Sequence, residues 1–261
     1  MIRAPVAAES FYPRDAGRLC AAVDRLLEEP EPWPGPRPWG IVVPHAGYRY
    51  SGPIAASGYA AARSCGDAIA RVVVLGPAHF VVLEGCAVSA ADAWRTPLGE
   101  VGVDPELRDV AFEAGCVLND LAHAPEHAIE VQLPFLQRVL GMGLGFLPVA
   151  VGETTPDEVS SLLAALDPYA DLFVVSTDLS HYLDLATARA LDRRTADAVV
   201  RLDPEAIGPW DACGVHALRG AVAFSRAVSM RIRLLDLRTS GDTAGDPDRV
   251  VGYGAFAIEA G

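Results

Sequence analysis

The sequence predicts an α/β fold in which helices cover both faces of a largely parallel or mixed central sheet. Short, continuously apolar segments alternate along the chain with longer segments of helical periodicity, the pattern of strands that are buried on both faces. The composition, 51% hydrophobic and 21% charged over 261 residues, supports a large core. The chain shows no internal repeat, low-complexity tract or persuasive domain boundary, so we expect one domain over residues 1–261.

The first helix and the first core strand have the clearest local signals. In the segment 14–29, apolar side chains recur on one helical face: Leu19, Val23, Leu26 and Leu27. The proline-rich stretch PEPWPGPRPW that follows is typical of a loop. It leads into the apolar run that predicts a strand at 40–44.

Further apolar runs, such as RVVVLG, GFLPVAV and DLFVVS, predict the other strands because they are short and separated by helical segments. These strands are expected at 71–76, 86–89, 145–151, 171–176, 230–237 and 250–258. The segments between them predict helices at 53–65, 104–115, 128–140, 156–166, 185–201 and 214–228.

Charge and hydropathy exclude two kinds of partner. The formal net charge of -13 and the pI of about 4.8 mean that most of the surface repels a polyanion, so we expect no nucleic-acid partner. No stretch approaches the roughly 20 apolar residues that span a bilayer, and the N-terminus lacks the pattern of a secretory signal. We therefore expect a soluble, cytoplasmic protein without a membrane partner, whose size and apolar content allow a homodimer.

Cysteine and lysine usage narrows the chemistry. The five cysteines are far apart and form no C-x-x-C pair, so neither a disulfide framework nor a zinc ribbon is indicated, and we expect reduced, mostly buried thiols. All 21 basic residues are arginine. The absence of lysine excludes a Schiff-base lysine, a pyridoxal-phosphate site and a Walker-type phosphate lysine.

Three of the six histidines, His45, His79 and His181, closely follow a predicted strand. In open α/β sheets, sites gather beyond the carboxyl ends of the strands, where loops carry polar groups on a rigid support. A single histidine at such a place is more often a structural hydrogen-bonding residue. Three at equivalent places predict a shared site.

Further polar residues could complete this site. In PEHAIEVQLPFL, His127 and Glu130 are three apart and can share a helical face, so the carboxylate could fix the imidazole tautomer; a solvated histidine at a helix start explains the pattern equally well. Asp178 could orient His181 or bind a metal directly. Asp242 follows another strand, although Asp beside Gly is also common in plain turns. Two imidazoles and one carboxylate form the facial arrangement favoured by non-haem Fe(II), and zinc accepts the same donors.

Several motifs resemble those of the Memo family, in order along nearly the whole chain. They are AAESFYP, VPHAGYRYSG, VVVLGPAH, TPLGEVGVD, EHAIEVQLPFL, STDLSHY, TSGD and VVGYGAFAI. Members of this family look like the catalytic subunit of class III extradiol dioxygenases, which cleave catechol-type rings with Fe(II). The resemblance implies that His45 and His79 belong to the metal site and that His127 and His181 lie in the pocket. It also implies AMMECR-type and radical SAM proteins as partners.

One departure from the family pattern concerns the third metal ligand. Some members have a cysteine near TSGD, whereas this chain reads Ser240, Gly241, Asp242, Thr243, Ala244 there and has no cysteine beyond Cys213. This puts a thiolate-containing copper site in doubt and favours Asp242 as an oxygen ligand. Glu259 and water remain alternatives.

Together these features predict a metal-binding, oxidative enzyme with Fe(II), or else copper or zinc, held by His45, His79 and Asp242. The expected catalytic residues are His181, His127 and Asp178, acting in proton transfer near neutral pH. Tyr48 and Arg49 are expected to line the mouth and attract an anionic small molecule. The rival interpretation is a non-catalytic protein that uses the pocket for a peptide or for an AMMECR-type or radical SAM partner. A serine hydrolase is disfavoured because no G-x-S-x-G motif is present.

Overall fold

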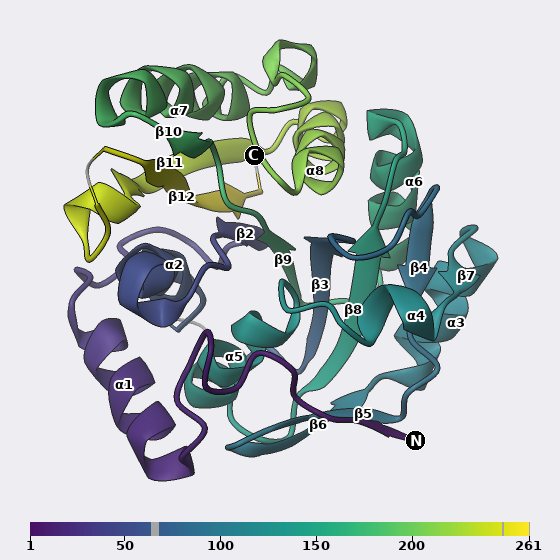
Figure 1. The fold of residues 1–261 in the computed structure, drawn as a ribbon. Helices are drawn as coiled ribbons and strands as arrows, with labels where there is room; N and C mark the ends of the chain where they lie inside the picture. Colours follow the sequence, from purple (N-terminus) through teal and green to yellow (C-terminus); the bar gives the residue numbers. More distant parts are fainter. Residues whose placement is uncertain (64–67, 247, 261) are drawn as a thin grey trace.

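Four parallel strands form the centre of the sheet in the computed structural model, which describes residues 1–63, 68–246 and 248–260 (Figure 1). They lie in the order β8 (Gly145–Val151), β3 (Arg71–Pro77), β9 (Leu172–Ser176) and β2 (Gly40–Val43). Nearly every residue in them is buried, as expected for strands covered on both faces. These are the strands that the continuous apolar runs predict, which confirms the predicted core.

The complete sheet is mixed and has twelve strands over the described residues. Next to β2 lie the antiparallel strands β12 (Val250–Glu259), β11 (Arg231–Thr239) and β10 (His181–Leu183). Beyond β8 lie β6 (Gly99–Val103), β5 (Ala93–Thr96) and β1 (Ile2–Arg3), while β4 (Cys86–Val88) joins β8 to β7 (Val117–Leu118). Five of these strands, β1, β5, β6, β7 and β10, are not predicted from the sequence, because they are two to five residues long and partly exposed.

The helices cover both faces of the sheet, as predicted. α1 (Ala16–Glu28), α2 (Tyr48–Arg63) and α5 (Leu133–Leu140) pack on one face with Ile41 and Val43. α3 (Pro105–Glu113), α6 (Pro156–Leu166), α7 (Leu185–Val200) and α8 (Val215–Ala227) pack on the other face with Val42. Alternate residues of one strand thus serve two separate cores (Figure 1).

Two predicted helix boundaries are wrong. α2 begins at Tyr48 rather than at residue 53, so the Tyr-Arg-Tyr run belongs to its first turn and Pro53 lies inside it; positions 64 and 65 of the prediction lie outside the described residues. The helix predicted at 128–140 is divided into a 3-10 turn at Glu130–Gln132 and α5, and the short α4 (Asp120–His123) precedes it. Of the helices in the described ranges, none has the length and apolar character needed to cross a membrane.

The register of the central strands places three loops at one edge of the sheet. Val43 of β2 is paired with Ser176 of β9, and Leu75 of β3 is paired with Val175. The chain therefore leaves all three strands at the same edge, and the loops that follow carry His45, His79 and the segment 177–181. This edge is where the rule for parallel sheets predicts a site.

Burial of Asp192 on α7 gives a testable consequence for stability. This carboxylate accepts the N–H of Ser180 at 3.0 Å through Oδ1, while Oδ2 has no hydrogen-bond partner and faces Gly252, where a Cβ would lie 1.9 Å from it. Burial raises the pKa of Asp192 from 3.8 to about 6. The folded protein therefore binds a proton that the unfolded chain does not hold between about pH 4 and 6.

We expect Asp192→Asn to stabilise the protein at pH 7 by roughly 3 kcal/mol, because the pKa of Asp192 is raised by about two and a change of one in pKa corresponds to about 1.4 kcal/mol. The advantage should shrink as the pH falls through 6, where the wild-type carboxyl becomes protonated and stops destabilising the fold. Urea unfolding at pH 5, 6 and 7 measures both quantities. The same difference in unfolding free energy between wild type and Asp192→Asn at all three pH values would contradict a raised pKa of Asp192.

Candidate metal centre

Three side chains from separate loops bring potential metal ligands together: His45 after β2, His79 after β3, and Cys213 just before α8. One donor atom from each lies within 4.8 Å of the others. Cys213 Sγ is 3.2 Å from His45 Nε2, and the rings of His45 and His79 are 5.3 Å apart, edge to face. His79 and Glu126 form a second group of this kind with His127. The prediction that His45 and His79 lie close together agrees with this geometry.

The tautomer of His45 is set by Ser176 at the end of β9. The Ser176 hydroxyl donates to the carbonyl of Ala128 at 2.7 Å and accepts from the side chain of Gln132 at 2.9 Å. Because its only proton is used, its oxygen accepts from Nδ1 of His45 at 3.0 Å. Burial lowers the pKa of His45 to about 3. The neutral ring thus presents the lone pair of Nε2 toward Cys213.

Glu126 orients the other two histidines. Its buried carboxylate accepts the N–H of His79 at 2.7 Å and Nδ1–H of the same ring at 3.0 Å, and its Oε1 lies 3.3 Å from Nδ1 of His127. It also accepts the N–H groups of His127 and Ala128. Burial alone would raise the pKa of Glu126, but these hydrogen bonds and the attraction to His79 lower it to about 2. Since a carboxylate only accepts, His79 keeps its proton on Nδ1 and leaves Nε2 free for a ligand bond.

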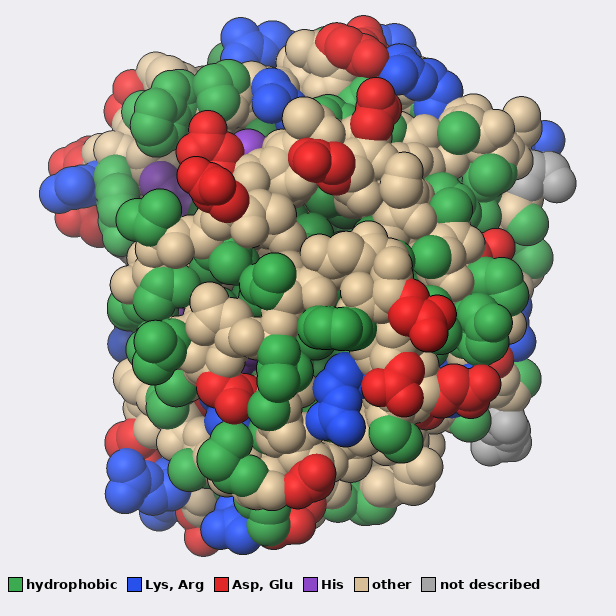
Figure 2. All heavy atoms as spheres, turned by 90° about the vertical axis from the view of Figure 1, so that its right-hand side faces the viewer, with side chains coloured by type: hydrophobic (Ala, Val, Ile, Leu, Met, Phe, Trp, Pro, Cys, Tyr) green, Lys and Arg blue, Asp and Glu red, His purple; other side chains and the backbone are tan. Residues whose placement is uncertain are grey.

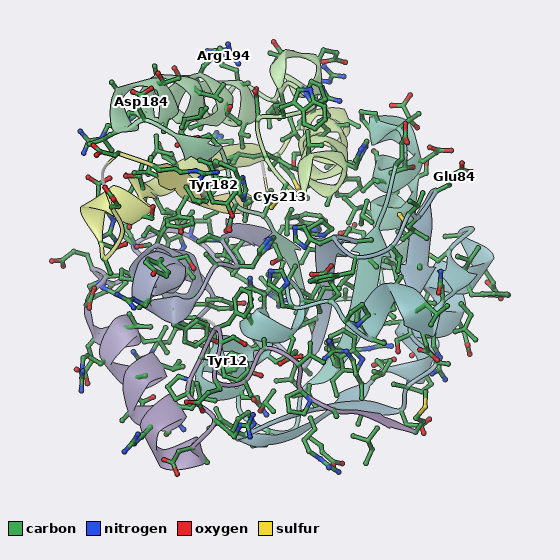
Figure 3. All side chains as sticks on the ribbon, viewed as in Figure 1. Tyr12, Glu84, Tyr182, Asp184, Arg194 and Cys213 are labelled. Carbon is green, nitrogen blue, oxygen red and sulfur yellow. The ribbon has the colours of Figure 1, made fainter. Side chains whose placement is uncertain are left out.

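Cys213 is positioned by the segment after β9 and lies between that segment and the start of α8 (Figure 3). Its Sγ is 3.3 Å from the N–H of Asp178, and its own N–H donates to the carbonyl of Asp178 at 3.2 Å. The next residue, Gly214, donates to Thr177 Oγ1 at 2.9 Å. Burial raises the pKa of the Cys213 thiol, so without a metal the S–H proton stays on sulfur and is shared with His45 Nε2.

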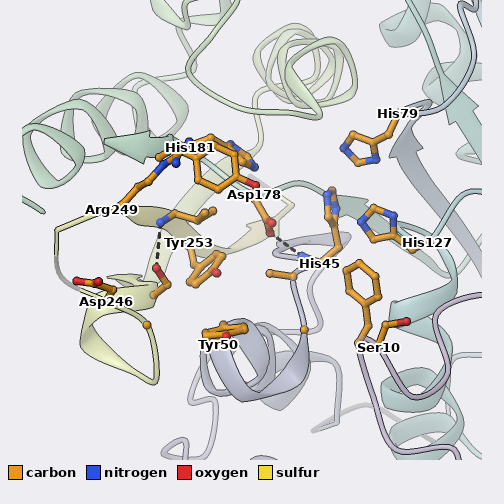
Figure 4. Close-up of a pocket in the computed structure, with 17 residues that line it drawn as sticks. Ser10, His45, Tyr50, His79, His127, Asp178, His181, Asp246, Arg249 and Tyr253 are labelled. Atoms are coloured by element: carbon orange, nitrogen blue, oxygen red, sulfur yellow. Dashed lines mark hydrogen bonds between the residues drawn. The ribbon is translucent and has the colours of Figure 1, made fainter. Parts of the chain in front are cut away.

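A pocket of about 680 Å³ opens over the histidines (Figure 4). His45, His79 and His127 line one side of it, while His181 and Arg249 lie on the opposite side. Aromatic side chains make up much of the remaining wall: Phe11, Tyr50, Tyr182 and Tyr253. Phe11 stacks on His127 with ring centroids 4.3 Å apart. Burial and the neighbouring His45 lower the pKa of His127 to about 4, so this ring is neutral near pH 7. The volume suits a small organic molecule.

Asp178 and His181 both line this pocket, but not as the expected pair. The buried Asp178 accepts the backbone N–H of His45 at 2.7 Å and thereby holds the His45 loop. Burial raises the pKa of Asp178. His181 instead donates from Nδ1 to the carbonyl of Leu179 at 2.8 Å. The expectation that Asp178 orients His181 is therefore wrong.

Tyr48 and Arg49 do not line the pocket mouth. The Tyr48 side chain is buried and its hydroxyl donates to the carbonyl of Val131 at 2.6 Å. Arg49 is exposed and lies over the ring of Tyr50 at 4.8 Å. The reason is that α2 already begins at Tyr48, so both residues belong to its first turn and not to a loop at the pocket mouth. Helical geometry directs their side chains away from the pocket. Tyr50 is the member of this run that reaches the pocket.

Asp242 does not join His45 and His79, and this corrects the predicted third ligand. It ends a 3-10 turn in which its Oδ2 accepts the N–H and the hydroxyl of Thr239, both at 2.8 Å, and it pairs with Arg189 of α7. The carboxylate lines a different pocket. The alternative ligand, Glu259, forms an ion pair with Arg233 at 2.7 Å. Its neighbour Ile258 is paired with Gly40 at the start of β2, whereas His45 follows the other end of this strand. Glu259 is therefore not part of the site.

Two residues of the centre, Cys213 and Glu126, are not predicted from the sequence. From the sequence, Glu130 is the carboxylate that could fix the tautomer of His127, but it accepts from Arg3, Tyr12 and the N–H groups of Val6 and Ala7. It therefore fixes the N-terminal segment. A carboxylate directly before His127 was the available signal for Glu126. A cysteine beside a glycine ahead of a predicted helix was the weaker signal for Cys213.

We expect neutral His45 to carry its proton on Nδ1, which long-range ¹H–¹⁵N correlation spectra report directly. In Ser176→Ala the acceptor for this proton is lost, so the Nε2–H form should gain population. His216 on α8, bonded through Nδ1 to Thr154, serves as the internal control and should not change. A wild-type spectrum with the His45 proton on Nε2 would contradict the assigned network.

Comparisons with known proteins identify the family and the fold. The family model described as Memo-like protein matches residues 3–257. MEMO1 family proteins from Methanopyrus kandleri, Methanosarcina acetivorans and Aquifex aeolicus are 34%, 35% and 36% identical to the chain, and in each case at least 97% of both sequences is covered. The crystal structure of the uncharacterized protein JW3007 from Escherichia coli K12 shares the fold, with a TM-score of 0.52 and 12% identity over 85% of this chain and 99% of that one. The chain belongs to the Memo-like family.

Proposed function

We propose that this protein is a metal-dependent oxidative enzyme whose metal is held by His45, His79 and Cys213. The observation that carries the proposal is the convergence of three donor atoms within 4.8 Å at one side of a pocket large enough for a small substrate. In both histidines Nδ1 is hydrogen-bonded, to Ser176 and to Glu126, which leaves each Nε2 free to bind a metal. Such support is typical of histidines that bind metals.

The donor set fits a first-row transition metal. Two imidazole nitrogens and one thiolate bind zinc, copper and iron, and a bound metal would replace the thiol proton that Cys213 now shares with His45. Sulfur in place of the carboxylate of Asp242 makes the site softer than the facial arrangement expected from the sequence. Cys213 also removes the ground on which the sequence puts a thiolate-containing copper site in doubt. Iron(II) is the proposed metal, and when bound it would supply the redox chemistry of extradiol-type reactions. Copper and zinc are the alternatives that a metal analysis separates.

The surrounding residues can bind substrate and move protons. Neutral His127 lies 5.1 Å from His79 and 5.5 Å from His45 between ring centroids, close enough to take a proton from a substrate hydroxyl near the metal ligands. His181, on the opposite side of the pocket, is available to return one. Asp178 acts as a positioning residue, because its contact is with the backbone of His45. Phe11 on the histidine side and the tyrosines elsewhere in the wall would shield a bound molecule from water.

We expect anaerobic reconstitution with iron(II), copper or zinc to give about one metal per chain in wild type. His45→Ala, His79→Ala and Cys213→Ser should each weaken binding by at least tenfold, because removing one of three ligands leaves an incomplete site. Metal content after gel filtration, measured by inductively coupled plasma mass spectrometry, reports the outcome.

Asp242→Asn is the matched control for this experiment. The sequence predicts Asp242 as a ligand, but its carboxylate is bonded to Thr239 and Arg189, so the variant should bind metal like wild type. Loss of metal in Asp242→Asn together with full retention in Cys213→Ser would overturn the proposed ligand set.

A second candidate function is partner binding, favoured by exposed apolar side chains beside the site. On the loop that carries His79, the exposed fractions of Phe80 and Val82 are 59% and 100%. Solvent exposure of such side chains next to a pocket is typical of a binding surface. The AMMECR-type and radical SAM proteins implied by the family resemblance are the proposed partners.

Val82→Asp tests this second candidate because it places a charge at the centre of the exposed loop. We expect it to weaken association with a purified AMMECR-type or radical SAM protein by at least tenfold in size-exclusion titrations, without changing metal content. The exposed Val117→Asp on β7 is the control. No association of wild type with either purified partner would remove this candidate.

A further inference from the structure

Arg249 has an unusual place in the metal-site pocket. Among the described residues that line this pocket, it is the only lysine or arginine. It precedes β12 and lies beside His181, on the side opposite His79 and His127 (Figure 4). Its guanidinium is 4.7 Å from the ring centre of Tyr182. The pocket is therefore asymmetric, with metal-binding nitrogens on one side and a fixed positive charge on the other.

The charge of Arg249 has no carboxylate partner in the part of the chain that the structure describes. Arg3, Arg71, Arg138 and Arg226 form ion pairs, whereas some exposed arginines, such as Arg49, form none among the described residues. What distinguishes Arg249 from the unpaired arginines elsewhere is its position in the lining of the metal-site pocket, where its exposed guanidinium is open to a ligand. The carboxylate of Asp246 also lines the pocket, where its Oδ1 accepts the N–H of Asp248 at 2.9 Å and no ion pair joins it to Arg249.

The wall near Arg249 suits a flat molecule. Tyr50, Tyr182 and Tyr253 contribute aromatic side chains to the pocket, and Val251 adds an apolar one. Aromatic rings favour offset-stacked or edge-on contacts with other rings. The planar guanidinium presents paired N–H donors that match the two oxygens of a carboxylate. One unpaired cation balances a single negative charge, whereas a phosphate dianion would leave one charge unbalanced.

We propose that Arg249 determines substrate specificity by binding the carboxylate of an aromatic carboxylic acid, whose other end reaches the histidine side of the pocket. The inference that Arg249 binds a carboxylate depends only on the position of Arg249 in the pocket. The orientation toward the metal ligands rests on the proposed function. From the sequence, Arg49 is the arginine expected to attract an anionic substrate. Arg49 lies outside the pocket, and we assign this role to Arg249 instead.

Binding of matched probes tests the inference. The probes are 3,4-dihydroxybenzoate and 4-methylcatechol, which differ in the carboxylate, together with benzoate, which has no ring hydroxyls. Isothermal titration calorimetry is carried out on the protein with and without bound metal. We expect wild type to prefer 3,4-dihydroxybenzoate over 4-methylcatechol on the order of tenfold, the size of one exposed charge-assisted contact. Arg249→Gln should abolish this preference.

Arg49→Gln is the matched control, because Arg49 is an exposed arginine that lies on Tyr50 but does not itself line the pocket, and this variant should keep the preference. Equal affinity of wild type for the two catechols, or an unchanged preference in Arg249→Gln, would overturn the inference. Tighter binding of phenyl phosphate than of benzoate would overturn the carboxylate assignment.

The same titrations separate this inference from the proposed function. Benzoate that binds the metal-free protein and depends on Arg249 supports the carboxylate subsite even when no metal binds at His45, His79 and Cys213. A metal that binds there while both catechols bind equally supports the metal centre and rejects the role of Arg249.

Discussion

The buried carboxylate of Glu126 is the interaction on which the candidate site depends most. It accepts hydrogen bonds from the His79 ring and from three backbone N–H groups of the segments that carry His79 and His127, and it lies 3.3 Å from Nδ1 of His127. A buried carboxylate is costly unless its lone pairs are used, and here the hydrogen bonds hold its pKa near 2. The same contacts that compensate for burial also fix the loop after β3 against the segment before α5.

The other two candidate ligands, His45 and Cys213, are held in place by β9 and the segment that follows it. Ser176 is paired with Val43, so its hydroxyl lies beside His45 as a consequence of strand register. Asp178, two residues later, holds the backbone of His45 and the sulfur of Cys213. The histidines thus follow the ends of β-strands and are hydrogen-bonded to buried polar side chains, which favours precise ligand positions.

Outside the pocket, acidic and basic side chains are interspersed over one face of the protein (Figure 2).

The central strands, most of the helices and the meeting of His45 with His79 could be predicted from sequence, because buried parallel strands have continuous apolar runs and end at one edge. The short strands β1, β5, β6, β7 and β10 could not, since each has only two to five residues and is partly exposed, and β1, β7 and β10 pair with strands far along the chain. The third ligand was also beyond local patterns. Asp242 has a plausible sequence position, but its turn bonds it to Thr239, while Cys213 reaches the centre through contacts with residues 35 or more positions away.

X-ray absorption spectroscopy at the metal edge of the reconstituted protein tests the central claim most directly, because sulfur and lighter ligands scatter differently. With His45, His79 and Cys213 as ligands, the spectrum should contain one sulfur at about 2.3 Å in addition to nitrogen or oxygen neighbours, and this sulfur should disappear in Cys213→Ser. A spectrum with only nitrogen and oxygen neighbours, identical in wild type and Cys213→Ser, would contradict the account.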